Sequence, residues 1–490
     1  MKHTPSHLIF LATFLSITYS SHFRGGTITW RPWNNTPSGS TVSILFRQRY
    51  SWRRLSVPCY DSTISSKGLI GSGSCTCVSG PCPTWSAMST STHCTDYSSI
   101  LDVSSGERYE LRTIPLNMSF SIAFPSGDWF ANLAKGGNSV WRITNRVSTF
   151  FRPDGYLNSS PVAVTLPIIY KEINIQHVHV IQMSDFDGTD TLKCRWSNGS
   201  TNTINGFDEC GGVCNGVLIS NLIEENCTIV FTLTVSGQYS AVALQIEDYY
   251  NDSQIVPMSS VPLQFLFYGY TKPSGCSTPP EIIGARPNRA CIGIRDNVNM
   301  TDTVIVQVHC SGSTITDFVS SSPIYVSLSI IDIYHLVVSW IPTSDQYGPQ
   351  PFCVGAVDSN SLQSIQWCIT YLVGFESPQV IKPQVVQGSA SPVGTIFKNH
   401  TVFSIQTTRS VNRPTRNGTF IYFWNASAGG TLVRKFDCGW ESEVTYTGFT
   451  TIIRFPTAPW TEGHFFYVTM DGGMNDKSFS SILVIKHIFN

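Results

Sequence analysis

The sequence predicts an all-β protein, with tandem immunoglobulin-like β-sandwich domains behind a divergent, cysteine-rich N-terminal β domain. Runs of β-branched and aromatic residues that suit strands recur along the chain, as at residues 41–46 and 229–235. Gly, Pro, Asn and Ser separate these runs at short intervals, and long segments with the 3.6-residue apolar period of a helix are missing. A repeated pattern of strand openings and closings divides the chain into units of sandwich size.

The first residues predict a secretory signal peptide. Lys2 and His3 precede an apolar run at residues 8–17, and small residues follow up to Ser21. The run is too short to span a bilayer, and no other segment of the sequence reaches that length. We therefore expect a secreted, extracellular protein with no membrane span in this chain.

The composition argues against two further classes of protein. Hydrophobic residues make up 41% of the 490 residues and charged residues 13%, which supplies several cores and is atypical of a disordered chain. The formal net charge is −1, so we expect no nucleic-acid partner.

Internal repeats indicate the domain boundaries. Proline-marked segments near residues 161, 279 and 378 lead into apolar strands, and an X-Pro bond favours extended backbone. Residues 237–269 and 348–374 each read as a Gly turn, a strand, an acidic turn and a final strand, which is typical of the last hairpin of an immunoglobulin-like sandwich. The expected parts are a signal peptide at 1–20, an N-terminal β domain with a cysteine-rich insertion at 21–160, and sandwiches at 161–275, 276–377 and 378–490.

Several motifs resemble known extracellular modules. Residues 184–188, Ser-Asp-Phe-Asp-Gly, lead to Cys194-Arg-Trp196 and resemble the second and third strands of PKD-like and cadherin-like modules. Residues 338–358 look like the end of a bacterial-type immunoglobulin repeat, and the last unit resembles another immunoglobulin-like class.

The order of these modules is similar to that of large uncharacterised extracellular multidomain proteins of animals. The matching elements are residues 21–30, 209–214 and 345–350. This resemblance implies an extracellular interaction role. It also implies that such a chain continues into further domains after Asn490, so that the last unit is truncated.

The 15 cysteines indicate disulfides, because an exported chain meets an oxidising environment. In the second unit we favour Cys194 with Cys227 and Cys210 with Cys214, although four cysteines allow three pairings. A bond from Cys276 to Cys368 would tie the first strand of the third unit to its last. The full set of disulfide candidates is Cys59, Cys75, Cys77, Cys82, Cys94, Cys194, Cys210, Cys214, Cys227, Cys276, Cys291, Cys310, Cys353 and Cys368.

The odd number of cysteines leaves one thiol outside the intramolecular bonds, and Cys438 is the candidate. Zinc on Cys75, Cys77, Cys82 and Cys94 is the alternative for the first group. We disfavour it because C-x-C spacing suits structural zinc poorly.

Sequons for N-glycosylation agree with export. The candidate acceptors are Asn34, Asn117, Asn158, Asn198, Asn226, Asn251, Asn299, Asn399, Asn417 and Asn425.

Two acidic turns form a candidate calcium site. Asp185, Asp187 and Asp190 place carboxylates close together in one turn, and Glu247 and Asp248 lie in another that would converge on it at one end of the sandwich. The alternative is an ordinary Asp/Gly turn that caps its own backbone, which we favour because no complete calcium loop is present.

A cationic and aromatic stripe forms a candidate glycan-binding site. Arg47, Arg49, Trp52, Arg53 and Arg54 would lie on an exposed strand, where clustered cations beside aromatic rings suit sulfated glycans. The alternative is a solvated strand edge on which charge deters aggregation.

Signatures of catalysis are missing from the sequence, including the G-x-S-x-G elbow and the H-E-x-x-H helix. We therefore expect a non-enzymatic secreted or cell-surface protein of adhesion, matrix or recognition type, which binds an extracellular protein or glycan through sandwich surfaces. One alternative is a secreted glycan-binding protein that uses the stripe at 47–54. Another is an accessory fragment of a larger extracellular hydrolase. Calcium is the one cofactor we consider.

Overall fold

A computed structural model describes residues 23–82, 85–187, 189–283, 286–332, 334–375, 386, 389–394, 396–407, 411, 413, 418–470, 483–485 and 488–489. Strands dominate these residues, and helices among them are short, as in α1 (Asp61–Ser65) and the 3-10 turn η1 (Gly211–Val213). The predicted all-β class, with a cysteine-rich N-terminal β domain followed by further β-sheets, is confirmed. The predicted signal peptide at 1–20 lies outside the described residues.

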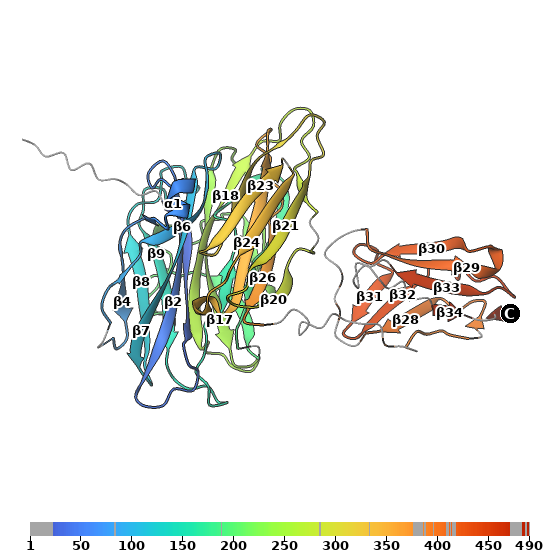
Figure 1. Cartoon of the computed structure of the whole chain (residues 1–490), viewed down its shortest axis with the longest axis horizontal. Coiled ribbons are helices and arrows are strands. Elements are labelled where there is room, and N and C mark those ends of the chain that lie inside the picture. The colour runs from blue at the N-terminus through green and yellow to red at the C-terminus, as the bar shows by residue number, and fades with distance from the viewer. Residues whose placement is uncertain are drawn as a thin grey trace, which may run out of the picture. The chain divides into compact units, whose positions relative to one another are not determined.

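The chain folds into two compact units. The first is drawn from residues 1–285 and 294–374, and the second from residues 286–293 and 375–490. In Figure 1 the strands β1 to β18 and β21 to β26 belong to the first unit, and those from β27 onward belong to the second. Among the described residues, none of the helices has the length and apolar content that a membrane span requires.

The N-terminal part of the first unit is built around two long antiparallel strands. β2 (Thr41–Arg53) pairs with β7 (Val103–Pro115) along its whole length. The sheet order is β3-β6-β7-β2-β1-β18-β9-β8-β4-β5. Its other strands are β1 (Phe23–Pro32), β3 (Leu69–Ile70), β4 (Ser74–Ser79), β5 (Met88–Ser89), β6 (Thr92–Ser98), β8 (Ser119–Ser126), β9 (Trp141–Ser148) and β18 (Ser259–Tyr270).

The inner face of this sheet carries a cluster of aromatic side chains. Tyr50 and Trp52 of β2 meet Phe23 of β1 and Trp141 of β9, and all four are at most 1% exposed. Alternate residues of a strand point to opposite faces, so the aromatic residues of β2 face this core and Arg47 and Arg49 face away from it.

Strand β18 joins the N-terminal domain to the segment that follows it. It pairs with β1, with β17 (Tyr239–Tyr249) and, in parallel, with β11 (Ile168–Glu172). At the crossing with β1, a Cβ on Gly25 would lie 2.1 Å from the carbonyl oxygen of Gln264, so only glycine fits this position. The residues on either side of the expected boundary at 160 therefore share one sheet and one hydrophobic core, where sequence repeats indicate separate sandwiches.

The remaining strands of the first unit form smaller sheets around this core. β10 (Val162–Val164) pairs with β13 (Gln182–Ser184) in a two-stranded sheet, whereas β14 (Thr191–Trp196) pairs with β17 and extends the large sheet. A three-stranded sheet has the order β12-β16-β15. Its strands are β12 (Gln176–Val180), β15 (Ser220–Ile223) and β16 (Thr228–Thr232).

The segment after residue 276 forms the third sandwich of the first unit. One sheet has the order β19-β21-β24-β23, and in the other β25 lies between β22 and β26. Its strands are β19 (Glu281–Ile282), β21 (Met300–Gln307), β22 (Ile315–Ser320), β23 (Val326–Asp332), β24 (His335–Trp340), β25 (Gly348–Asp358) and β26 (Trp367–Val373). All but the last residue of β20 (Ala290–Ile294) belong to the segment 286–293 of the second unit.

This third sandwich packs against the two preceding segments instead of standing apart. β25 is buried at every position, because one side faces its own sandwich and the other contacts β10 and β13. Cys353 and Val357 of β25 belong to the same core as Phe23, so the expected boundary at 275 does not separate two cores either. Polar contacts reinforce this packing, as where the Asp96 carboxylate accepts the backbone N–H of Ser320 at 2.6 Å.

The second unit is a smaller sandwich with its own core. Its sheets have the orders β28-β32-β31 and β30-β29-β33-β34, and β27 pairs with β35. Phe423 lies at the centre of its aromatic core and contacts Phe403, Phe436, Phe455 and Trp460. The strands are β27 (Ile396–Phe397), β28 (Val402–Gln406), β29 (Phe420–Asn425), β30 (Thr431–Asp437), β31 (Val444–Thr447), β32 (Thr450–Arg454), β33 (Phe466–Met470), β34 (Leu483–Ile485) and β35 (Ile488–Phe489).

Disulfide bonds cross-link segments of the first unit. The bonds Cys194–Cys227 and Cys210–Cys214 coincide with the pairs that the sequence favours. The expected bond from Cys276 to Cys368 is wrong, because each of these residues lies beside a nearer cysteine in the fold. The remaining bonds are Cys59–Cys94, Cys77–Cys82, Cys276–Cys310 and Cys353–Cys368.

Three cysteines form no disulfide, whereas the odd total of 15 requires only one such cysteine. Cys75 and Cys291 are disulfide candidates in the sequence but thiols in the structure, as is Cys438. The zinc alternative fails because three of its four cysteines are consumed by disulfides, which leaves only the buried thiol of Cys75.

Candidate cation site

The acidic turn predicted from the sequence folds into a compact group of carboxylates. Asp185 follows β13, and Asp187 and Asp190 lie in the loop that leads to β14. The Asp185 carboxylate accepts the backbone N–H of Asp187 at 2.9 Å, which curls the loop. As a result, one carboxylate oxygen from each of the three aspartates lies within 4.8 Å of the others.

Asp248, at the end of β17, is the fourth member of the group that we call the acidic cluster. Its side chain is fully buried and accepts the backbone N–H and the hydroxyl of Ser259 at 2.7 and 2.6 Å. The amide nitrogen of Asn158, from the segment before β10, donates to its other oxygen at 2.6 Å. Three segments distant in sequence therefore meet at the acidic cluster.

One arginine balances part of this charge. The guanidinium of Arg152 lies 3.0 Å from an oxygen of Asp187 and makes two hydrogen bonds to Asp190, at 3.0 and 2.7 Å. It also lies 3.3 Å from Asp154, which is more exposed. Asp185 and Asp248 have no ion pair among the described residues.

The pKa values of the cluster reflect this shortage of cations. Burial raises the pKa of Asp248 to about 7, even though Ser259 and Asn158 donate to its carboxylate. The pKa of Asp185 is raised well above its usual range, mainly by burial and secondly by repulsion from the Asp248 carboxylate. Burial also raises the pKa of Asp190 to about 6, and the Arg152 guanidinium only partly opposes that shift. The fold therefore holds carboxyl groups in a setting that favours either protons or a bound cation.

Glu247, the fifth residue of the predicted calcium site, does not belong to the cluster. Neighbouring residues of a strand point to opposite faces, so Glu247 points away from the side on which Asp248 lies. Its carboxylate accepts from Arg195 at 2.9 Å, from Ser260 at 3.1 Å and from the hydroxyl of Tyr249 at 2.9 Å. The prediction that Glu247 and Asp248 converge on one ion is wrong for this reason.

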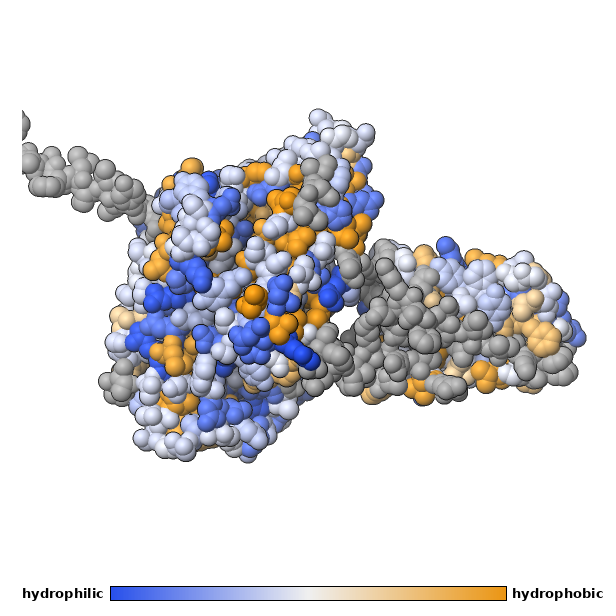
Figure 2. Space-filling model, viewed as in Figure 1, coloured by the Kyte–Doolittle hydropathy of each residue, from blue (hydrophilic) through white to orange (hydrophobic). Residues whose placement is uncertain are grey.

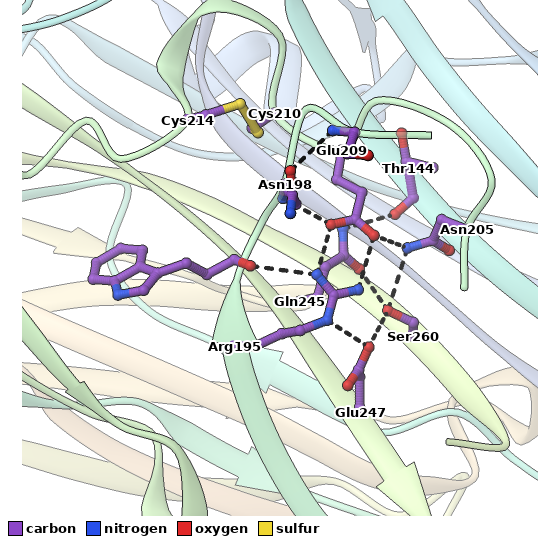
Figure 3. A network of polar contacts seen from close by, with 12 residues as sticks. Thr144, Arg195, Asn198, Asn205, Glu209, Cys210, Cys214, Gln245, Glu247 and Ser260 are labelled. Atoms are coloured by element: carbon purple, nitrogen blue, oxygen red, sulfur yellow. Dashed lines mark hydrogen bonds and ion pairs between the residues drawn. A yellow bond between two sulfur atoms is a disulfide. The ribbon is translucent and has the colours of Figure 1, made fainter. Parts of the chain in front are cut away.

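Arg195 and the two glutamates around it form a closed polar network (Figure 3). Arg195 makes two hydrogen bonds to the fully buried Glu209, at 2.7 and 2.8 Å, and a third to Glu247. Asn205 and the backbone of Asn198 donate to the remaining lone pairs of Glu209. Burial alone would raise the pKa of Glu209, but the hydrogen bonds and charge of Arg195 outweigh it and lower that pKa.

A second group of potential metal ligands lies beside this network. Asp208, Cys210 and Cys214 place ligand atoms within 4.8 Å of one another. Cys210 and Cys214 are joined by a disulfide, shown in Figure 3, and the Asp208 carboxylate accepts the backbone N–H groups of Cys210 and Gly211. The group therefore closes a loop and offers no thiolate to a metal.

The predicted glycan-binding stripe is buried instead of exposed. Arg47 is 6% exposed and Trp52 is 1% exposed, and Trp52 lies in the aromatic core. The Arg47 and Arg49 guanidinium groups both pair with the fully buried carboxylate of Glu107. The sequence interpretation assumed that this face of β2 is solvated, but the third sandwich covers it.

The last two arginines of the stripe also have partners in the protein. Arg53 pairs with Asp102 at 2.7 Å, and Arg54 donates to the carbonyl of Cys59 and lies over the rings of Tyr60 and Tyr97. The stripe is therefore a structural element of the first unit and not a continuous cationic surface.

Two glycosylation candidates are buried, which corrects the sequence prediction for them. Asn158 is 2% exposed and donates to Asp248, and Asn425 is 7% exposed with its amide 2.8 Å from His464. Asn417 lies outside the described residues. The candidates with exposed side chains are Asn34, Asn117, Asn198, Asn226, Asn251, Asn299 and Asn399.

The sequence did not indicate the roles of two residues at the site. Arg152 stands in a short loop with no periodic pattern around it, and no local signal connects it with aspartates more than thirty residues away. Asn158 reads as a glycosylation acceptor in the sequence, and its packing against Asp248 depends on the tertiary fold.

Comparison with known proteins finds one family model. The model described as "Integrin beta-like protein A-E, N-terminal" matches residues 24–149, so the similarity lies in the N-terminal β domain. No curated protein matches the chain.

Solved structures give only weak likenesses. An I-band fragment of titin is 8% identical over 67% of this chain and 99% of its own, with a TM-score of 0.15. The N-terminal Ig1-2 module of the Drosophila receptor protein tyrosine phosphatase DLAR is 12% identical over 44% of this chain and 100% of its own, with a TM-score of 0.17. An endo-fucoidan hydrolase of glycoside hydrolase family 107 is 13% identical over 62% of this chain and 39% of its own, with a TM-score of 0.16. Scores this low carry no argument for adhesion or for hydrolysis.

Proposed function

We propose that the chain is a non-enzymatic extracellular protein of adhesion or recognition type, which binds a protein or glycan through the surfaces of its β-sandwiches. The observation that carries this proposal is the disulfide framework of the first unit. Six bonds join cysteines there, and disulfides of this density persist in oxidising, extracellular environments. The match of residues 24–149 to an integrin beta-like N-terminal family adds support.

The architecture suits the presentation of a binding surface. Three sandwich-sized segments share one core in the first unit, and polar contacts such as that between the Glu107 carboxylate and the backbone N–H of Ile324 tie the first segment to the third. A rigid scaffold of this kind holds exposed loops and strands in place, which lowers the entropy lost on binding. On the visible face of the first unit, hydrophilic residues are interspersed with apolar ones, which suits a polar recognition surface more than an obligate hydrophobic interface (Figure 2).

An adhesion assay tests this proposal. The oxidised full chain is coated on a plate, and attachment of cells from its source organism is measured against coating density. We expect saturable attachment that is lost when the disulfides are reduced. Absence of attachment by the oxidised chain would overturn the proposal. Turnover of a polysaccharide or peptide by the same preparation would replace it with the hydrolase alternative.

A second candidate function, glycan binding, is favoured by a row of aromatic rings in the second unit. Phe420, Tyr422 and Trp424 are the outward-facing residues of β29, and Tyr467 lies beside Trp424 on β33. Successive ring centroids are 5.9, 5.8 and 6.1 Å apart. Lys435 lies 4.4 Å from the Phe420 centroid at one end of the row. Aromatic surfaces of this kind contact the C–H faces of sugars, and a cation beside them suits an acidic glycan.

A glycan array with paired variants tests the second candidate. Trp424→Ala is expected to lower binding, whereas Trp440→Ala serves as the matched control because Trp440 is 75% exposed in the same unit and lies outside the row. Equal binding by both variants would exclude the row as the glycan site.

A further inference from the structure

We propose that the acidic cluster binds a calcium ion that fastens the loop at 185–190 to the rest of the first unit. The cluster brings four carboxylates together, and of these four Arg152 pairs with those of Asp187 and Asp190. Asp185 and Asp248 are left without an ion pair among the described residues, although their carboxylates are shielded from solvent. A second positive charge is therefore missing from the site.

Unpartnered oxygens give an independent indication of a ligand. One carboxylate oxygen of Asp185 is buried without a hydrogen-bond partner, and so is the amide oxygen of Asn158, whose side chain is 2% exposed. Buried polar atoms are nearly always satisfied in folded proteins, so two unsatisfied oxygens on residues of this site indicate that a partner belongs there.

The chemistry of these atoms favours calcium. Every candidate ligand is a carboxylate or amide oxygen, and the described part of the cluster contains no imidazole or thiolate, which zinc would prefer. Calcium takes six to eight oxygens in a flexible geometry and tolerates mixed ligands, whereas magnesium demands a near-ideal octahedron. Oxygens of Asp185, Asp187 and Asp190 already lie within 4.8 Å of one another, which suits ligands around a single ion.

An ion bound at the acidic cluster would also stabilise a contact with the third sandwich, through Phe186. Phe186, between two of the candidate ligands, packs against Tyr347 with ring centroids 5.4 Å apart. Gly348 makes room for this contact, because a Cβ there would lie 2.7 Å from the Phe186 ring. Holding Asp185 and Asp187 on an ion therefore also holds Phe186 against the start of β25.

Calorimetric titration of the oxidised, chelator-stripped full chain with calcium chloride tests the proposal. We expect saturable binding of one ion and a rise in the melting temperature of the first unit. Asp185→Asn is expected to weaken binding by roughly tenfold or more, because affinity follows the charge of the ligands. The fold should survive this change, since the variant removes a repulsion.

A matched control and two adverse outcomes make the test decisive. Asp252→Asn removes an exposed carboxylate that accepts a hydrogen bond from Thr191, and it is expected to leave calcium binding unchanged. No binding at about 1 mM calcium, the weak end for extracellular sites, would overturn the proposal. Binding that survives in Asp185→Asn would overturn the location. Either failure leaves the adhesion proposal untouched, because that proposal does not depend on this ion.

Discussion

Replacing Glu107 with glutamine is expected to destabilise the first unit strongly. Glu107 lies on β7, is fully buried, and is the common partner of the Arg47 and Arg49 guanidinium groups. Its other oxygen accepts the backbone N–H of Ile324, at 3.2 Å, from the third sandwich. The substitution keeps the shape of the side chain and leaves two guanidinium groups without their counter-charge.

The magnitude follows from the burial of the partners. Removing one member of a buried ion pair costs about 3–5 kcal/mol, because the remaining charge stays desolvated. Arg47 is 6% exposed, so water cannot replace the carboxylate beside it. Ordinary domains are stable by only about 5–15 kcal/mol, so the loss is a large fraction of the total.

The sign of the pH dependence gives a second check on Glu107. Burial alone would raise its pKa, but Arg47 and Arg49 outweigh burial and lower that pKa. A carboxyl group with a lowered pKa stabilises the folded state above its unfolded pKa and loses that contribution as the pH falls through the folded one. The difference between wild type and Glu107→Gln should therefore be full at pH 7 and shrink in acid.

Urea unfolding of the oxidised full chain, followed by tryptophan fluorescence, measures the effect. Glu110→Gln on the same strand is the control, since Glu110 pairs with Arg108 and Arg112 nearer the surface and its loss should cost less than about 1 kcal/mol. Equal stability of the two variants would refute the inference that Glu107 holds a buried ionic contact.

Retention on a heparin column that disappears with Arg47→Ala, while the fold is intact, would restore the glycan-binding interpretation of the stripe.

Three further predictions concern the first unit. In the presence of a chelator, its melting temperature should fall as the pH rises from about 4 to 7 and level off above that, because burial raises the pKa of Asp248 from 3.8 to about 7 and the folded state loses stability as the pH rises between these values; Asp248→Asn should flatten this profile. Asn158→Gln should leave the electrophoretic mobility of the secreted chain unchanged, because Asn158 is buried, whereas loss of the exposed Asn117 should increase mobility if that sequon is occupied. Replacing Cys194 and Cys227 together should cost about 4 kcal/mol in urea unfolding, since their bond closes a loop with a sequence separation of 33; an unchanged midpoint would show that the bond is not formed.

Local patterns in the sequence were sufficient to predict the β architecture and part of the candidate site. Alternating and β-branched runs correctly indicated β2 and β16, because strand formation depends mainly on neighbouring residues. The turn at Asp185 and Asp187 could be recognised because its members are close in sequence and bond to each other's backbone. Strand alternation, applied to Glu247 and Asp248, also separates these two residues without any tertiary information.

Which strand faces meet water depends on the tertiary fold. Arg47 and Arg49 have the pattern of a solvated strand face, and they are buried because a sandwich more than two hundred residues later in the chain covers that face. The repeats likewise indicated separate domains, but the pairing of β1 with β18 merges two of them into one core. Whether a charged residue is exposed or buried with a partner depends on such distant segments, because they remove it from solvent. The local sequence pattern does not indicate which distant segments will do so.

The amino-acid sequence alone was therefore enough for the all-β class of fold and for strands such as β2 and β16. The folded chain was needed to bring Asn158, Asp185 and Asp248 around one point and to pair Arg152 with just two of the carboxylates in the acidic cluster. The physical reason is range: backbone conformation responds to the nearest few residues, whereas charge balance and the satisfaction of buried polar atoms depend on every segment that the fold brings together.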